Sequence, residues 1–122
     1  MIKMIFTGKR GPDKTADEFK AYYLKQHAPL FLKTVPHVRK YTINFPTVRP
    51  GKEPPPFDFI TEVWWDDMDT VRAFYKSDAY KNIIQPDEVK LGAVGQGVYF
   101  DEYVYLDEVS QTIVIPPSTA MA

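Results

Sequence analysis

The chain has 122 residues, 15 basic and 16 acidic side chains, a formal net charge of −1 and no cysteine. The length fits one domain, the balanced charge gives no general footprint for nucleic acid or an anionic membrane, and the lack of cysteine excludes disulfides, thiolate catalysis and cysteine-ligated metals. Because no apolar run is long enough for a signal-peptide core or a membrane span, we expect a cytoplasmic protein.

Four segments predict β-strands. Residues 2–7 are short and apolar, residues 38–45 alternate, and residues 58–65 and 98–105 are rich in aromatic and β-branched side chains. Residues 46–57 contain five prolines and one glycine and predict a long, stiff loop. Alternation in the third strand puts Phe59, Thr61, Val63 and Trp65 on one face and Asp58, Ile60, Glu62 and Trp64 on the other.

A helix is predicted to begin after Thr15. Thr15 and Glu18 have the spacing of a capping box, in which each side chain bonds the backbone N–H of the other residue. Pro29 disfavours helical geometry at the residue before it, so we expect this helix to end or kink near His27. Its periodic face holds Ala16, Phe19, Tyr23 and His27.

The second helical region follows residue 65. Asp67 or Asp69 suits a helix start, and the stripe of Met68, Val71 and Tyr75 indicates its buried face. Ser77 or Asp78 is a candidate cap for a further short helix, which we expect Pro86 to interrupt. Residues 87–93 are expected to resume it before three glycines lead out.

The resulting order β-α-β-β-α-β predicts an α+β ferredoxin-like domain with a four-stranded antiparallel sheet over residues 1–108. Its helices cover only one sheet face. Because both faces of residues 58–65 are apolar, we expect two sheets to pack face to face in a homodimer; the alternative is a partly exposed sheet. The apolar tail, residues 109–122, is expected to pack on the partner subunit.

His27 is the main candidate for chemistry. Imidazole both accepts and donates protons near neutral pH, so one interpretation is an acid/base group that faces a cavity. The other is a partly buried histidine at a helix C-terminus, where the helix dipole favours its cation. His37 follows Pro36 at a strand start and is interpreted as an exposed loop residue.

Carboxylates and phenols supply candidate partners for His27. Glu62 lies mid-strand among apolar neighbours, so it either assists proton transfer or forms a structural ion pair with Arg39, Lys40 or Arg72. Asp58 is a weaker candidate of the same kind. Aromatic residues make up 15% of the chain, which favours an aromatic-lined cavity for a small molecule. Tyr23, one turn before His27, is the first choice among Tyr22, Tyr23, Tyr75, Tyr80, Tyr99 and Tyr103.

Several familiar sites lack support in the sequence. There is no GxGxxG, P-loop or GxSxG motif. A metal site would require His27, His37 and a carboxylate to converge, and the chain has no HxH or HxxxH spacing, so we expect no metal.

The segments "KRGPDKTADEFKAYYLKQHAPL", "VRKYTINF" and "FDFITEVWWDDMDTVRAFYKSDAY" resemble the EthD family of dimeric α+β barrel proteins over about residues 2–106. The most specific part is "HAPL", which begins at His27. The resemblance implies a dimer formed through the sheets and a pocket between sheet and helices. It also implies activity without metal or organic cofactor, with the histidine at the end of the first helix corresponding to His27. Methylmuconolactone isomerase relatives have a cysteine where this chain has Val63, which disfavours that activity.

The leading hypothesis is a cofactor-independent lyase or isomerase that acts on a small aromatic or polyketide-like compound. His27 would move the proton with Glu62 and Tyr23, and a ring would be enclosed by a substrate-binding set comprising Tyr22, Asp58, Trp64, Tyr75 and Tyr80. The alternatives are a cofactor-free monooxygenase and a non-catalytic small-molecule-binding protein.

Overall fold

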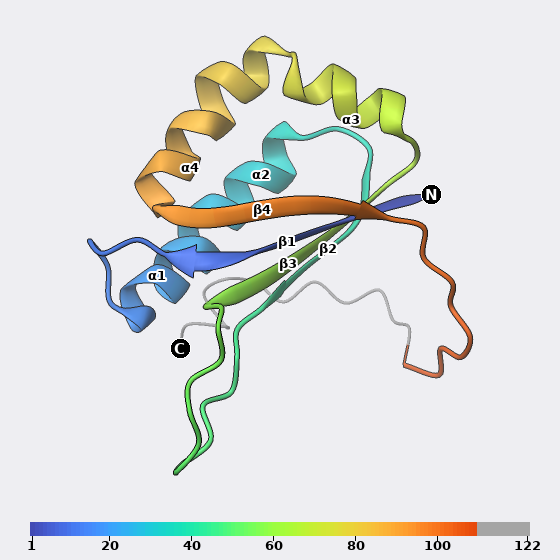
Figure 1. Ribbon diagram of the computed structural model, residues 1–122. Helices are drawn as coiled ribbons and strands as arrows, with labels where there is room; N and C mark the ends of the chain where they lie inside the picture. Colours follow the sequence, from blue (N-terminus) through green and yellow to red (C-terminus); the bar gives the residue numbers. More distant parts are fainter. Residues whose placement is uncertain (110–122) are drawn as a thin grey trace.

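The computed structural model describes residues 1–109, which form an antiparallel sheet covered on one face by helices (Figure 1). The strand order is β2-β3-β1-β4. None of the helices in this part of the chain is long and apolar enough to cross a membrane. In chain order the elements are β1 (Ile2–Arg10), α1 (Ala16–Tyr22), η1 (Tyr23–His27), α2 (Ala28–Thr34), β2 (Val38–Asn44), β3 (Phe59–Trp65), α3 (Met68–Tyr75), η2 (Tyr80–Ile84), α4 (Gln85–Leu91) and β4 (Ala93–Phe100).

The predicted ferredoxin-like α+β fold is confirmed. The capping box is formed: Thr15 Oγ1 accepts from the backbone N–H of Glu18 at 3.1 Å, and the Glu18 carboxylate accepts from the backbone N–H of Thr15 at 2.9 Å. Asp67 caps α3 through the backbone N–H of Thr70 at 2.8 Å. Both helices therefore begin at the polar residues that the sequence indicates.

At both prolines, where an end, a kink or an interruption is predicted, the structure has an irregular turn, but the helix does not end there. Each proline is preceded by a π-helical turn, η1 before Pro29 and η2 before Pro86. In each wider turn, a backbone N–H donates to the carbonyl oxygen five residues earlier. Ala28 donates to Tyr23, and Gln85 donates to Tyr80. Such a turn relieves the clash between a proline ring and the preceding turn, so the helix continues into α2 or α4.

The last strand is also displaced from its predicted position at residues 98–105. β4 occupies Ala93–Phe100 and pairs with β1, with Gly95 opposite Gly8. A Cβ atom at Gly95 would collide with the carbonyl oxygen of Thr7. Gly95 and Gly97 therefore lie inside the strand, where Gly95 permits close backbone approach, and only Gly92, with a φ of 75°, leads out of α4.

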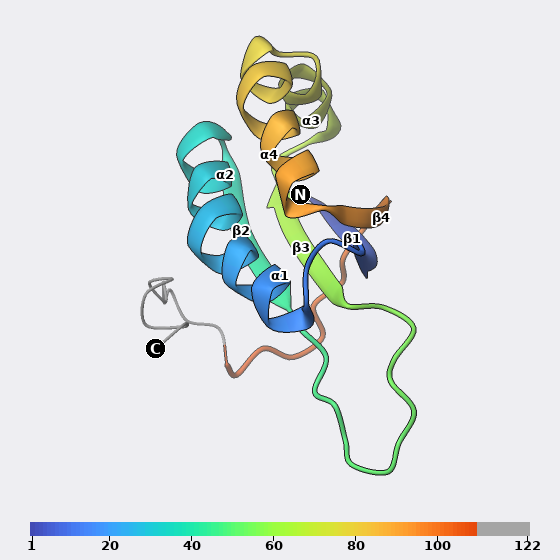
Figure 2. The same cartoon turned by 90° about the vertical axis from the view of Figure 1, so that its left-hand side faces the viewer.

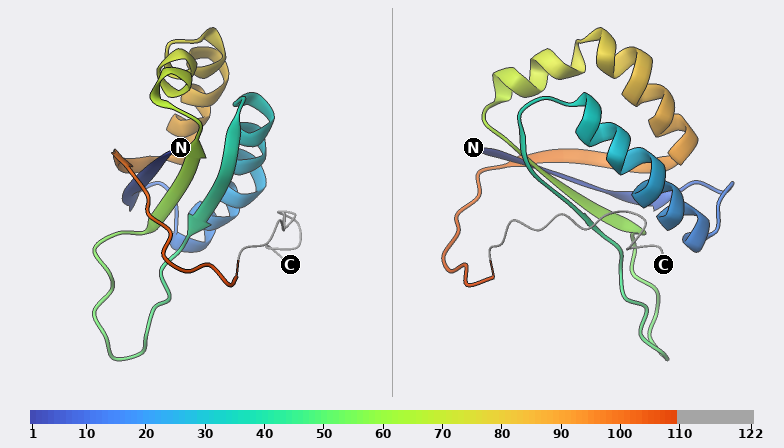
Figure 3. Two further views of the ribbon diagram at one scale, coloured as in Figure 1. Left: turned by 90° about the vertical axis from the view of Figure 1, so that its right-hand side faces the viewer. Right: turned by 180° about the vertical axis from the view of Figure 1, so that it is seen from behind.

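The core lies between the sheet and the helices. One cluster surrounds Trp65, Phe74 and Ile84, and a second surrounds Phe19 and Phe59 at the other end of the sheet. Seen along the sheet, the helices lie on one side and the other face is left open (Figure 2). The proline-rich loop between β2 and β3 extends well beyond the sheet (Figure 3), as its sequence indicates. The predicted tail contact lies outside the described residues.

Candidate active site

His27 pairs with a carboxylate that the sequence analysis did not single out. It is the last residue of η1 and is 5% exposed. Its Nδ1 atom lies 2.8 Å from Oδ2 of Asp87, in the first turn of α4, and both side chains are largely buried. An ionised carboxylate only accepts hydrogen bonds, so Asp87 fixes the imidazole proton on Nδ1. The pair joins two helical segments that are distant in sequence.

A tyrosine completes this arrangement. The Tyr22 hydroxyl donates to the other oxygen of Asp87, Oδ1, at 2.6 Å. Burial and the neighbouring carboxylate raise the pKa of Tyr22 to about 12, so the phenol keeps its proton. Asp87 therefore accepts from Tyr22 and His27 at once. We name these three residues the Asp87 triad.

The second nitrogen of His27, Nε2, is not engaged by the Asp87 triad. Within residues 1–109, Nε2 has no hydrogen-bond partner. In this part of the chain, the side-chain atoms that are fully buried without a partner are Arg10 Nε and Trp65 Nε1. His27 Nε2 does not belong to this group. With the proton held on Nδ1, the lone pair of Nε2 points away from Asp87. The imidazole is thus arranged as a proton acceptor whose cation Asp87 would stabilise.

Tyr23 packs against His27 but directs its hydroxyl elsewhere. The two rings lie edge to face with centroids 5.5 Å apart. The Tyr23 hydroxyl lies 2.5 Å from Oγ1 of Thr61 on β3, in the buried core. Burial raises the pKa of Tyr23 to about 12, although the Thr61 hydrogen bond lowers it. Tyr23 therefore holds the His27 ring in position by packing, while its own proton is retained.

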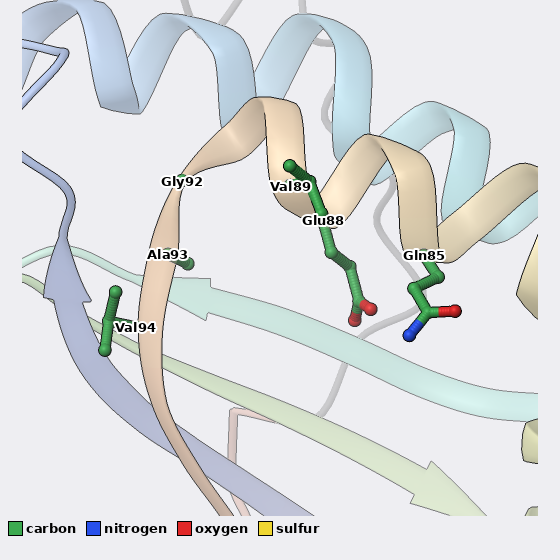
Figure 4. Close-up of a pocket in the computed structure, with 6 residues that line it drawn as sticks. All are labelled: Gln85, Glu88, Val89, Gly92, Ala93 and Val94. Atoms are coloured by element: carbon green, nitrogen blue, oxygen red, sulfur yellow. The ribbon is translucent and has the colours of Figure 1, made fainter.

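A pocket of about 350 Å³ lies between α4 and β4 (Figure 4). Glu88, the neighbour of Asp87, lines it and accepts a hydrogen bond from the Tyr80 hydroxyl at 2.7 Å. The Tyr75 hydroxyl lies 3.9 Å from Sδ of Met4. His27 is not a lining residue of this pocket; its link to the pocket is through the consecutive residues 87 and 88. The lining residues are Gln85, Glu88, Val89, Gly92, Ala93 and Val94.

The structure does not bring Glu62 or Trp64 to His27, because both project from the open face of the sheet. Glu62 pairs with Lys3 at 2.7 Å and accepts from Thr42 at 2.8 Å. Burial opposes ionisation of Glu62, but the hydrogen bonds from Lys3 and Thr42 outweigh it and lower the pKa. Trp64 donates to Glu102 at 2.7 Å. Of the two alternatives for Glu62, the structure shows the ion pair, but with Lys3 and not with Arg39, Lys40 or Arg72; the carboxylate beside His27 is Asp87.

Two other candidate positions lie away from His27. Asp58 accepts from the backbone N–H of Arg10 at 2.8 Å and so ties the start of β3 to the end of β1. His37 is exposed in a turn with a φ of 62°, and it borders a separate hollow of about 450 Å³ between the end of α2 and α3. Among residues 1–109 no group of three or more potential metal ligands converges.

Asp87 and Glu88 are the residues that sequence reasoning missed. A proline followed by two acidic residues, as at Pro86, is a common helix start, and this pattern could have drawn attention to both acids. The sequence predicts that a helix resumes at residue 87, but it does not predict which face of that helix contacts η1. The contact between α4 and η1 joins segments that are distant in sequence. The periodicity of apolar residues within each segment therefore cannot predict it.

Comparison with known proteins relates the whole fold to solved structures. The EthD domain profile matches residues 11–92, and no curated protein matches. An EthD family protein from Bacillus halodurans is 25% identical, with a TM-score of 0.65 over 84% of this chain and 99% of its own. A dimeric ferredoxin-like protein of unknown function from Bacteroides fragilis is 13% identical, with a TM-score of 0.57 over 83% and 95%. SnoaB, a cofactor-independent oxygenase from Streptomyces nogalater, is 16% identical, with a TM-score of 0.54 over 88% and 95%.

Proposed function

We propose that this chain, which belongs to the EthD domain family, is a cofactor-independent lyase or isomerase that moves a proton on a small aromatic or polyketide-like compound. The observation that supports this is the buried contact of 2.8 Å between His27 Nδ1 and Asp87. It leaves Nε2 as the basic atom of a histidine whose orientation and tautomer are fixed. We expect the protein to act in the cytoplasm.

The chemistry follows from the Asp87 triad. His27 Nε2 removes a proton from a carbon next to a carbonyl, or from a hydroxyl, and becomes imidazolium. The Asp87 carboxylate stabilises that cation, and Tyr22 supports Asp87 by donating to its second oxygen. The same proton is then returned to a different atom for isomerisation, or to a leaving hydroxyl for dehydration. A positioned acid/base group of this kind contributes on the order of 10²–10⁴ in rate.

The substrate-binding part of the proposal comprises the α4 pocket together with Tyr75 and Tyr80, which do not line that pocket but reach it through the Tyr80 hydrogen bond to Glu88. Burial raises the pKa of Tyr75 and of Tyr80, and the Glu88 carboxylate reinforces both effects. Both phenols therefore remain donors at neutral pH. Tyr23 supports the His27 ring. Glu62, Trp64 and Asp58 keep a proposed role only through a partner subunit, since they lie apart from His27 in the protomer.

The proposed assembly is a homodimer that covers the open face of the sheet. Val98 and Phe100 on this face are each 44% exposed. Apolar side chains gathered on one sheet face favour burial against a partner. The Bacteroides fragilis neighbour is described as dimeric.

A cofactor-free monooxygenase is the second candidate, because SnoaB shares the fold and is described as a cofactor-independent oxygenase. The same base would remove a proton from the methylene carbon of an anthrone, and the resulting carbanion would react with dioxygen. With an anthrone as substrate, one O₂ is consumed and one quinone and one water are formed. A binding protein without turnover is the third candidate.

A proton-exchange experiment and a dioxygen-uptake measurement together separate the three. The protein is incubated in D₂O with 2′,4′-dihydroxyacetophenone, and NMR follows exchange of the methyl protons next to the carbonyl. We expect wild type to accelerate exchange and His27→Asn to lose the acceleration by on the order of 10²-fold or more. His37→Asn is the matched control, because asparagine tolerates left-handed backbone geometry.

The proposal fails if His27→Asn exchanges protons as fast as wild type. Binding of the ketone without accelerated exchange identifies the binding protein instead. Dioxygen uptake with an anthrone, measured in an oxygen electrode, identifies the monooxygenase.

A further inference from the structure

Glu88 is a carboxylate at the wall of the α4 pocket with one oxygen unused. Its Oε1 atom accepts from the Tyr80 hydroxyl at 2.7 Å, while Oε2 has no hydrogen bond within residues 1–109. The side chains of Glu88 and Gln85 extend from the same side of α4 (Figure 4). Both residues line the pocket, so the free carboxylate oxygen is available to a ligand.

The surroundings of Glu88 are phenols, not cations. One phenol contacts it directly, since the Tyr80 hydroxyl donates to its Oε1 atom at 2.7 Å, and the Glu88 charge adds to the raised pKa of Tyr23, Tyr41, Tyr75 and Tyr80. In the described part of the chain no lysine or arginine forms an ion pair with Glu88, and none lines the pocket. The pocket therefore carries negative charge that is not neutralised, and it favours ligands that donate a hydrogen bond over ligands that bring a second anion.

The remaining wall is apolar. Val89, Ala93 and Val94 lie on the two sides of a shallow, open hollow of about 350 Å³, in which Val89 is 76% and Val94 67% exposed. Gln85 adds one amide, which both donates and accepts. These features suit a flat apolar ring that carries a hydroxyl group at one end.

We propose that the α4 pocket selects neutral hydroxylated aromatic ligands, whose hydroxyl donates to Glu88 Oε2, and rejects aromatic carboxylates. This inference rests on the proposed function and specifies the substrate class of the same protein. It makes Glu88 a specificity-determining residue. His27, by contrast, performs the proton transfer and contributes little to this choice.

Fluorescence or calorimetric titration with 2-naphthol and 2-naphthoate tests the inference on the full chain. We expect wild type to bind 2-naphthol at least tenfold more tightly than 2-naphthoate. Glu88→Gln keeps the shape and the acceptor for Tyr80 but removes the charge. We expect it to weaken 2-naphthol binding and strengthen 2-naphthoate binding, so that the preference shrinks by about tenfold or more. Glu53→Gln, in the exposed loop, is the matched control and keeps the wild-type preference.

The inference is overturned if 2-naphthoate binds as tightly as 2-naphthol, if neither probe binds, or if Glu88→Gln keeps the full preference. His27→Asn distinguishes this test from that of the proposed function. We expect the variant to retain the preference for 2-naphthol while losing proton exchange. If His27→Asn instead exchanges normally while Glu88 still sets the preference, the acid/base proposal fails and the specificity inference stands.

Discussion

Replacing Asp87 by asparagine separates the chemical role of the Asp87 triad from its structural role. Asparagine offers one acceptor and one donor in place of two acceptors. The Tyr22 hydroxyl needs the acceptor, so the asparagine NH₂ group faces His27 Nδ1. The imidazole then presents a lone pair at Nδ1, and its proton moves to Nε2. The atom that we propose as the base is thereby blocked.

The two consequences differ in size. Two hydrogen bonds to a charged group, at 2.6 and 2.8 Å, become neutral hydrogen bonds. A charged hydrogen bond contributes roughly 1.5–3 kcal/mol and a neutral one roughly 0.5–1.5 kcal/mol, so Asp87→Asn should lower the free energy of unfolding by about 1–3 kcal/mol. The protein stays folded. Proton exchange, however, should fall by on the order of 10²–10⁴, because the base is lost.

Long-range ¹H–¹⁵N correlation NMR measures the tautomer directly, and urea denaturation measures stability. The chain has only two histidines, and the exposed His37 serves as an internal reference. Asp69→Asn is the matched control, because Asp69 forms a surface pair with Arg72. If Asp87→Asn keeps the proton on Nδ1 of His27 and exchanges at the wild-type rate, the reasoning from the Asp87 triad is refuted.

Three further outcomes follow from the structure. Because burial raises the folded-state pKa of Tyr23 from 10.0 to about 12, its contribution to stability, roughly 2–3 kcal/mol, is complete below pH 10 and is lost as pH rises toward 12. Urea denaturation at several alkaline pH values, with phenolate absorbance, should reveal this loss, and a flat stability from pH 10 to 12 would contradict it. Thr15→Ala should lower the free energy of unfolding by about 1 kcal/mol, since it removes the N-cap of α1; an unchanged urea midpoint would argue against the cap. Val98→Asp puts a charge on the open face and should convert a dimer to a monomer in sedimentation velocity, while Val48→Asp in the loop should not. A Val98→Asp variant that remains dimeric would exclude sheet-to-sheet packing.

Much of the fold was predictable because its determinants are local. A capping box needs only Thr15 and Glu18 at the right spacing, and the structure forms it. The third strand alternates over Phe59–Trp65, and the buried positions Phe59, Thr61 and Val63 follow that alternation. Its position was therefore predicted to within one residue.

The course of the chain at the two prolines depends on more than local rules. Pro29 and Pro86 disfavour an α-helical turn before them, but a π-helical turn avoids the clash and keeps the chain helical. The cost of that wider turn is offset by tertiary packing, since Tyr23 and Ile84 in these turns are buried. Rules based on local sequence include the energetic cost of helix next to a proline. They do not include the stabilisation that the helix gains when its side chains are buried in the core.

The identity of the His27 partner illustrates the limit of pattern reasoning at the site. Alternation correctly assigned Thr61 and Glu62 to opposite faces of β3, yet it did not indicate which face meets the helices. The structure turns Thr61 toward Tyr23 and leaves Glu62 with Lys3 on the open face. A carboxylate for His27 therefore has to come from a helix that packs against η1. That contact brings α4 and its Asp87 to the histidine, and it exists only because the chain stays helical through both prolines.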